Sequence, residues 1–260
     1  MYFVCRKLLS TMVLCILFTI DSTAELINVS DAIKAAREQE VLTQQLLKDY
    51  CMVGMKNQFN NAAKRAREHI AHFEKNIGEL DDFATSKEAF KSSEKTAKLW
   101  EPIKKLLFAE KSWVGAQEIQ KRMREMLVVN RVTTKIYTIQ TGLMLGEVIN
   151  AAVDIEVNSQ KMAMLYLMSA WGIYDASMES EMKSTIKEFE ASVKMLKGEK
   201  VNTPKMLAKL KEVERDFLYF KMMDVLGSRS IPTLIYKKSN TILKSARELA
   251  AAYDKSIILN

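Results

Sequence analysis

The chain repeats itself at one constant offset. When the sequence is shifted by 116 positions (156 − 40), Glu40 falls on Glu156 and Tyr50 falls on Tyr166. The same offset, without a gap, gives the other matches: Ala35/Ala151, Ala36/Ala152, Val41/Val157, Gln44/Gln160, Ile70/Ile186, Phe73/Phe189, Glu74/Glu190, Leu80/Leu196, Ile119/Ile235, Leu127/Leu243, Arg131/Arg247 and Tyr137/Tyr253. One offset kept through four separate segments indicates a duplicated unit, so both halves should adopt the same fold.

Composition and the positions of the breaks predict that each unit is helical. Only 8 glycines and 3 prolines occur in 260 residues, and abundant Lys, Glu, Ala, Leu and Met favour helix over strand. Thr203 followed by Pro204 is typical of a helix start. The periodicity predicts helices at about 28–56, 58–80, 87–109 and 112–141, and again at about 143–174, 176–197, 203–226 and 231–257.

Four amphipathic helices with short connections form an antiparallel four-helix bundle. The expected fold is therefore all-α, with one bundle in residues 25–141 and a second in residues 142–260. Only Gln140-Thr141-Gly142 stands at the junction, and it is not turn-rich. We expect the last helix of the first unit to run on into the second unit, which would place the bundles end to end, unless Gly142 breaks the helix.

The first 24 residues have the pattern of a secretory signal peptide. Arg6 and Lys7 precede the apolar run LLSTMVLCILFTI, which is shorter than an ordinary membrane span, and small residues end at Ala24. Cleavage after Ala24 predicts a periplasmic protein. An uncleaved anchor is the alternative.

Cleavage changes the charge and the thiol content. Loss of two cations and Asp21 takes the net charge from +7 to 7 − 2 + 1 = +6, and Cys51 stays as the only thiol. An internal disulfide is then excluded, and Cys51 is expected to be either a buried apolar residue or an intermolecular bridge. The basic residues alternate with acidic ones along the chain, so we expect no nucleic-acid partner.

The first helix of each unit has an unusually wide apolar face with a polar step in it. Positions 29, 33, 36, 40, 43, 47 and 50 share one face, and a neighbouring stripe is apolar as well. Such a helix can pack in its own bundle and still offer a surface to a partner. The step itself is Glu40 with Thr43 in the first unit, and Glu156 with Ser159 in the second.

A buried carboxylate needs compensation, because an unpaired one costs several kcal/mol. In an antiparallel bundle, pairing Tyr137 with Ile33 brings Arg131 close to Glu40. The same register brings Arg247 close to Glu156, which predicts a structural ion pair in each unit. Two alternatives are solvation of the carboxylates by water and a binding site for a ligand or partner.

At these residues the chain resembles the PilJ/NarX-type sensor domain, the extracytoplasmic region of type IV pilus chemotaxis transducers and nitrate sensors. The resemblance lies in the run from Ala36 to Gln45 with Lys48 and Tyr50, in Ala152 and 159–163, in Leu99-Trp100-Glu101-Pro102, and in the helix from Asn130 to Tyr137. It covers both units and implies four-helix sensor bundles. The ligand-binding residues that it implies are Gln39, Glu40, Thr43, Gln44, Glu156, Ser159, Gln160 and Lys161.

The sequence departs from that family where an anion would bind. In the nitrate sensors an arginine precedes the methionine of the motif, and the matching residues here are Glu40 and Glu156. A carboxylate repels nitrate. We therefore expect any small ligand to be a cation or a neutral polar molecule.

Nothing in the sequence indicates an enzyme, a cofactor or a metal site. His69 and His72 share one helix face, but neither follows a glutamate three residues earlier as the di-iron bundles require. No phosphate-binding glycine loop and no nucleophile elbow occurs. The methionines are expected to fill the core.

Two functions follow as expectations. The first is a non-enzymatic periplasmic sensor or binding module, which hands its state to a membrane receptor or pilus-associated protein, because the sequence carries no output domain. The alternative is a structural or interaction protein without a small ligand, which docks on such a partner, or forms a homodimer, through its first-helix faces.

Overall fold

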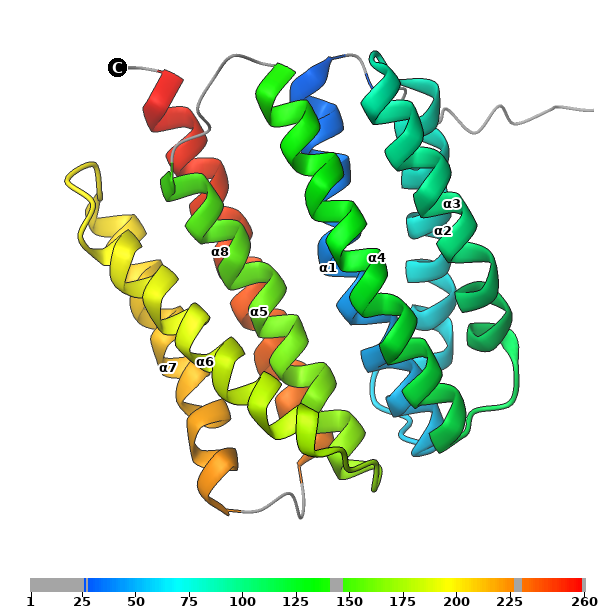
Figure 1. The fold of residues 1–260 in the computed structure, drawn as a ribbon. Coiled ribbons are helices and arrows are strands. Elements are labelled where there is room, and N and C mark those ends of the chain that lie inside the picture. Colours follow the sequence, from blue (N-terminus) through cyan, green and yellow to red (C-terminus); the bar gives the residue numbers. More distant parts are fainter. Residues whose placement is uncertain (1–25, 27, 141–146, 227–230, 259–260) are drawn as a thin grey trace, which may run out of the picture.

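The structure is a computed structural model in which residues 26, 28–140, 147–226 and 231–258 are described. These ranges form only helices and no strand, as the all-α prediction requires (Figure 1). The helices are α1 (Val29–Gly54), α2 (Ala62–Asp82), α3 (Lys87–Phe108), α4 (Trp113–Gln140), α5 (Glu147–Ala170), α6 (Ala176–Lys197), α7 (Pro204–Leu226) and α8 (Pro232–Ile258). The predicted signal peptide and the junction 141–146 lie outside the described residues.

Local chemistry places the helix starts. The side chains of Asn28 and Ser86 accept hydrogen bonds from backbone amides three residues on, which caps α1 and α3. Pro204 is the first residue of α7, and the hydroxyl of Thr203 accepts a hydrogen bond from the third amide of the turn at 3.3 Å. This start was predicted from the sequence, because proline lacks the amide that a first helical turn leaves unpaired.

The helices pack in two groups of four, which we call repeat 1 (α1–α4) and repeat 2 (α5–α8). In repeat 1, α1 packs on α2 and α4, and α3 packs on α4. In repeat 2, α5 packs on α6 and α8, and α7 packs on α8. In each group the first helix packs between the second and the fourth, and both of these run in the opposite direction (Figure 1).

The two repeats lie side by side, so the end-to-end arrangement expected from the sequence is wrong. α1 packs lengthwise against α5, and both helices run in the same direction (Figure 1). α4 and α5 run in opposite directions, so they do not form one straight helix. The physical reason is the wide apolar face of the first helix, which each repeat buries against the other.

Equivalent tyrosines make equivalent bonds in the two repeats. The hydroxyl of Tyr137 donates to the carbonyl of Leu80, and that of Tyr253 donates to the carbonyl of Leu196. The hydroxyls of Tyr50 and Tyr166 each accept a hydrogen bond from the backbone amide of the residue just before the fourth helix, Ser112 in repeat 1 and Ile231 in repeat 2. Residues aligned by the constant offset thus occupy the same structural positions.

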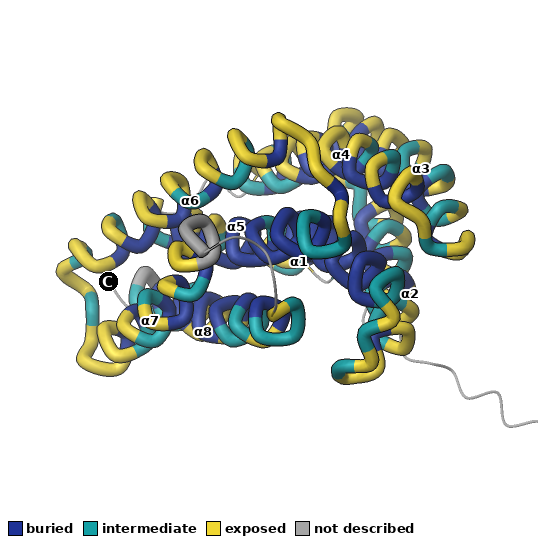
Figure 2. The backbone as a smooth tube through the Cα atoms, turned by 90° about the horizontal axis from the view of Figure 1, so that it is seen from below, coloured by how far each residue is buried: buried dark blue, intermediate teal, exposed yellow. Residues whose placement is uncertain are grey.

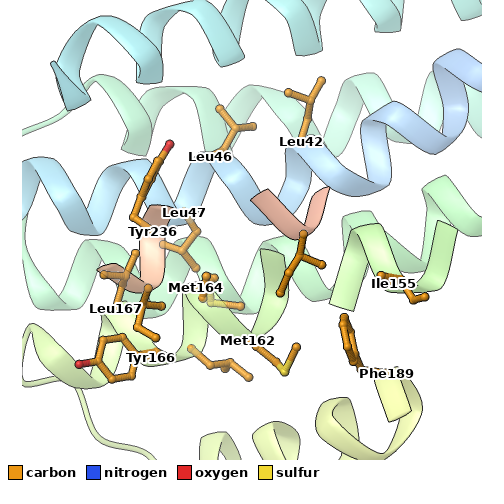
Figure 3. Close-up of a cluster of buried hydrophobic side chains, with 14 of the residues drawn as sticks. Leu42, Leu46, Leu47, Ile155, Met162, Met164, Tyr166, Leu167, Phe189 and Tyr236 are labelled. Carbon is orange, nitrogen blue, oxygen red and sulfur yellow. The ribbon is translucent and has the colours of Figure 1, made fainter. Parts of the chain in front are cut away.

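The core runs through both repeats. Residues 39–52 of α1 are all buried, and so are nearly all residues of α5 from Ile155 to Met168. Seen along the helices, α1 and α5 occupy the middle of the molecule and are mostly buried, while the other helices surround them and carry the exposed residues (Figure 2). Side chains of α1, α5, α6 and α8 meet in one cluster, which includes Leu47, Met164 and Tyr236 (Figure 3). In the described ranges no helix is long and apolar enough to span a membrane.

Alanine substitutions at two glycines test the contact between α1 and the end of α5. A Cβ at Gly54 would lie 2.1 Å from the ring of Trp171, whereas one at Gly78 in α2 would meet nothing within 4 Å. Gly54→Ala should lower the free energy of unfolding by about 1–3 kcal/mol through overpacking. Gly78→Ala is the control and should raise it by roughly 0.5–1 kcal/mol. Denaturant titration measures both values, and equal stabilisation by both alanines would contradict this packing.

Candidate functional site between the two repeats

The polar step of the first helix lies in the interface between the repeats. Gln39, Glu40, Thr43, Gln44 and Gln45 are all buried. Their burial follows from the position of α1, which is covered by α2, α4 and α5. Polar groups in such a place need partners within the protein, since water does not reach them.

Each buried carboxylate meets the arginine of its own repeat. Arg131 Nε lies 3.5 Å from Glu40 Oε2, and Arg247 Nε lies 3.3 Å from Glu156 Oε2. Glu40 also accepts a hydrogen bond of 2.7 Å from the Thr134 hydroxyl. The sequence-predicted pairs are thus brought together, with each arginine about half exposed and each carboxylate facing inward.

Burial outweighs these partners in setting the proton affinity of the carboxylates. It raises the pKa of Glu156 to about 7, although the nearby Arg247 acts to lower it. Burial also raises the pKa of Glu40, against the opposing effects of the Thr134 hydrogen bond and Arg131. Both groups therefore hold a proton more readily than an exposed glutamate does.

The charges form one layer that crosses from repeat to repeat. Arg247 donates to Glu38 Oε2 of repeat 1 at 2.5 Å as well as to its own Glu156. On the other side, burial raises the pKa of Asp154 in repeat 2, whereas Arg131 of repeat 1 lowers it. Asp154 and Glu38 are equivalent positions (154 − 116 = 38). Arg247 thus contacts the other repeat directly, and Arg131 acts on the equivalent carboxylate of the other repeat through its charge, so the two sides are related like those of a homodimer.

Carboxylates outnumber arginines in this layer. Arg37 adds a third cation and donates to Asn150 Oδ1 of repeat 2 at 3.0 Å. Burial lowers the pKa of Arg37, while Glu40 and Glu156 raise it. We call these seven residues the charged layer: Arg37, Glu38, Glu40, Arg131, Asp154, Glu156 and Arg247.

The two hydroxyls predicted to bind a ligand, those of Thr43 and Ser159, form hydrogen bonds with other groups of the protein. Thr43 donates to the carbonyl of Gln39 at 2.7 Å and accepts from Asn130 Nδ2 at 3.1 Å. Ser159 donates to the carbonyl of Glu156 at 2.8 Å. Two buried atoms beside Thr43, namely Gln39 Nε2 and Asn130 Oδ1, have no partner among the described residues.

Lys161 lies apart from the charged layer, in a second bridge between the repeats. Its ammonium is 3.0 Å from Glu181 of α6, and Arg124 of α4 donates to the same carboxylate at 2.7 Å. Lys161 therefore ties α6 to α5 within repeat 2, and Arg124 ties the same carboxylate to repeat 1. The structure does not bring it together with Glu156.

A buried lysine and aspartate at the interface were not predicted from the sequence. Lys48 has no exposed surface, and its ammonium donates to Gln160 Oε1, to Ser239 Oγ at 3.2 Å and to Asn240 Oδ1 at 2.7 Å. All three acceptors belong to repeat 2. Burial lowers the pKa of Lys48 to about 7, while the Asp49 charge acts to raise it. The ring of Tyr236, 4.1 Å away, also favours the ammonium form.

Asp49 is equally buried and completes this cluster. It accepts a hydrogen bond of 2.6 Å from the Tyr236 hydroxyl and lies 2.6 Å from His69 Nδ1. Arg65 Nε is 3.6 Å from the same carboxylate and donates to the Tyr236 hydroxyl at 2.9 Å. Burial and the Asp49 charge raise the pKa of Tyr236. A signal for the cluster was present in the sequence, since the residues of repeat 2 equivalent to Lys48 and Asp49 are apolar.

The remaining candidate residues, Cys51 and His72, do not belong to the charged layer or to the Lys48–Asp49 cluster. Cys51 is fully buried, and burial raises the pKa of its thiol, so it is packed as an apolar residue. His72 lines an open groove of about 570 Å³ with Leu26, Asp31, Lys34, Ala35, Glu38, Lys75, Asn76, Glu79 and Arg247. Within the described ranges no group of His, Cys, Asp and Glu is placed to hold a metal ion.

Comparison with known proteins gives no relative. No family model, no curated protein and no solved structure matches the chain.

The pKa of Glu156 predicts a pH dependence of stability. A folded-state pKa raised from 4.5 to about 7 means that the folded protein binds more protons than the unfolded chain between these values. This contribution is complete below about pH 4.5 and is lost as the pH rises through 7. Glu156→Gln should remove on the order of 2–3 kcal/mol of the change between pH 4.5 and 7.5.

Urea titrations of the wild type and the variant at several pH values measure this difference. Glu147→Gln, at the exposed start of the same helix, serves as the control and should follow the wild type. A Glu156→Gln protein with an unchanged pH profile would show that Glu156 is ionised throughout the range.

Proposed function

We propose that the protein is a non-enzymatic extracytoplasmic binding or sensing module, in which the two repeats act as the two subunits of a dimer. The observation that carries the proposal is the charged layer, because it links both repeats and contains more carboxylates than arginines. Buried charge of this kind adds little to stability. Its presence is better explained by a change in the layer, and hence in the pairing of the repeats, when a charged species binds.

A cation is the ligand class that fits. Three arginines face four carboxylates, so the ionised layer has a net charge of 3 − 4 = −1. The groove lined by Glu38 and Arg247 opens on the edge of the layer and offers a path to it. Asp31 and Glu79 on the wall of that groove are paired with Lys34 and Lys75, so the wall adds no net charge and the negative charge comes from the layer itself. The bound cation would replace the proton that Glu156 holds below about pH 7.

The resemblance to PilJ/NarX-type sensor domains supports the sensing role, and the carboxylates at 40 and 156 argue against nitrate. α1 and α5 bury against each other the first-helix faces that we expected to be offered to a partner. A membrane receptor or pilus-associated partner would therefore have to bind another surface.

An interaction protein without a small ligand is the second candidate. The observation that favours it is an exposed apolar group at the end of the molecule where α3 and α5 finish. Phe108, Trp113, Val114 and Tyr174 are each more than half exposed there. The two loops that carry them are adjacent, because the Trp113 ring lies within 4 Å of the Cβ position of Gly172. Apolar groups of this kind often mark docking sites.

A thermal-shift screen tests the proposed function. The probes are putrescine, spermidine, choline, calcium and magnesium, with nitrate as the anion. A cation at a hundred times its Kd should stabilise the protein by about 2.7 kcal/mol, a rise in Tm of roughly 5–10 °C. The shift should be larger at pH 8 than at pH 5.5, because the proton competes for the carboxylates.

The double variant Glu40→Gln/Glu156→Gln should lose the shift, and Glu147→Gln should keep it. A shift by nitrate that survives the double variant would overturn the cation assignment. If no probe stabilises the protein at either pH, the binding role is wrong and the interaction role is the one to pursue.

A further inference from the structure

The most asymmetric region of the interface is the pair Lys48 and Asp49. Both side chains are fully buried in repeat 1. At the equivalent positions (48 + 116 and 49 + 116) repeat 2 carries Met164 and Leu165. Apart from Arg37, whose equivalent is Val153, the residues of the charged layer have counterparts on both sides of the interface, whereas this pair exists on one side alone.

The groups that receive Lys48 are specific to repeat 2. Its ammonium donates to Ser239 and Asn240 of α8, as well as to Gln160 of α5. The residues of repeat 1 at the positions of Ser239 and Asn240 are Met123 and Arg124. Two acceptors are thus replaced by an apolar group and a cation.

Two copies of repeat 1 would therefore pair badly through this interface. The symmetry of the interface would bring Lys48 of one copy against Met123 and Arg124 of the other. A buried ammonium would lose two acceptors and gain a guanidinium neighbour, which is strongly unfavourable. Arg124 would also meet Arg65 in place of Glu181, since Arg65 and Glu181 are equivalent positions.

Two copies of repeat 2 would also lose contacts. Met164 would face Gln160 and Ser239, so the acceptors now bound by Lys48 would have no donor. The Tyr236 hydroxyl would lose Asp49, because the equivalent residue is Leu165. Buried polar groups without partners are costly, so this pairing is weakened as well.

We propose that Lys48 and Asp49, which are charged in repeat 1 and have no charged equivalents in repeat 2, make the interface heterotypic, so that repeat 1 pairs only with repeat 2. We call this pair the lock. The two faces satisfy each other within one chain. Like repeats of different chains are rejected by unpaired buried charge, which is how interfaces gain specificity. Together with the tether between the repeats, which favours pairing within one chain, the lock closes the chain as a monomer, rather than as the homodimer that the sequence left open as an alternative. The inference does not depend on the proposed function.

A double-mutant cycle tests the lock directly. Asn240→Arg installs the residue that repeat 1 carries at this position, and it should lower the Tm by about 5 °C or more through repulsion of Lys48. Lys48→Met installs the residue of repeat 2. It should lower the Tm in the wild-type background and raise it in the Asn240→Arg background. If Lys48→Met leaves the Tm unchanged or raises it in both backgrounds, the buried ammonium does not stabilise the native pairing of the repeats, and the lock is refuted.

Light scattering across a range of protein concentrations tests the consequence for assembly. The wild type should stay monomeric, and Lys48→Met/Asp49→Leu should form dimers as the concentration rises. Phe73→Leu, which weakens the contact with Trp100 inside repeat 1, is the control and should stay monomeric. A dimeric wild type, or a strictly monomeric double variant, would overturn the inference. If the double variant does not fold, the cycle with Asn240→Arg decides alone.

Discussion

The parallel packing of α1 on α5 is the constraint on which the rest of the structure depends. It buries two central helices along most of their length and creates a single core that spans both repeats, in a chain whose described residues form no disulfide. It also means that the polar residues on those faces depend on partners within the protein. The polar step at Glu40 and Glu156 is tolerated because the fourth helix of each repeat supplies an arginine.

Two polar regions share this interface and differ in kind. Apart from Arg37, the charged layer is symmetric, and it lies closer to the starts of α1 and α5, with Arg131 and Arg247 still about half exposed to solvent. The Lys48–Asp49 cluster is one-sided and lies toward the ends of the same helices, with no exposure at either charged group. A layer near solvent can exchange protons or cations. A sealed cluster instead fixes which surfaces pair, because opening it would leave an ammonium and a carboxylate without partners.

A duplicated chain can do what a symmetric dimer cannot. Once both copies of an interface are encoded in one chain, each side can change independently. Repeat 1 carries a lysine and an aspartate, and repeat 2 presents the matching acceptors and the Tyr236 hydroxyl from α8. The effective concentration of tethered repeats also favours pairing within the chain. Surfaces outside the interface, such as the exposed apolar group that includes Phe108 and Trp113, are not needed for this pairing.

The sequence by itself determined the helices, the duplication and the contacts within a repeat. Periodicity and capping residues are local, and the register of an antiparallel bundle links Glu40 to Arg131 by counting alone. Only the tertiary structure decided that the repeats lie side by side. A wide apolar face in the sequence shows how much surface must be buried, but it does not show which helix covers that surface. The tertiary structure also decided the partners of Lys48, which come from α5 and α8, far along the chain. No local pattern encodes such contacts, and only the mismatch with Met164 and Leu165 marked the place.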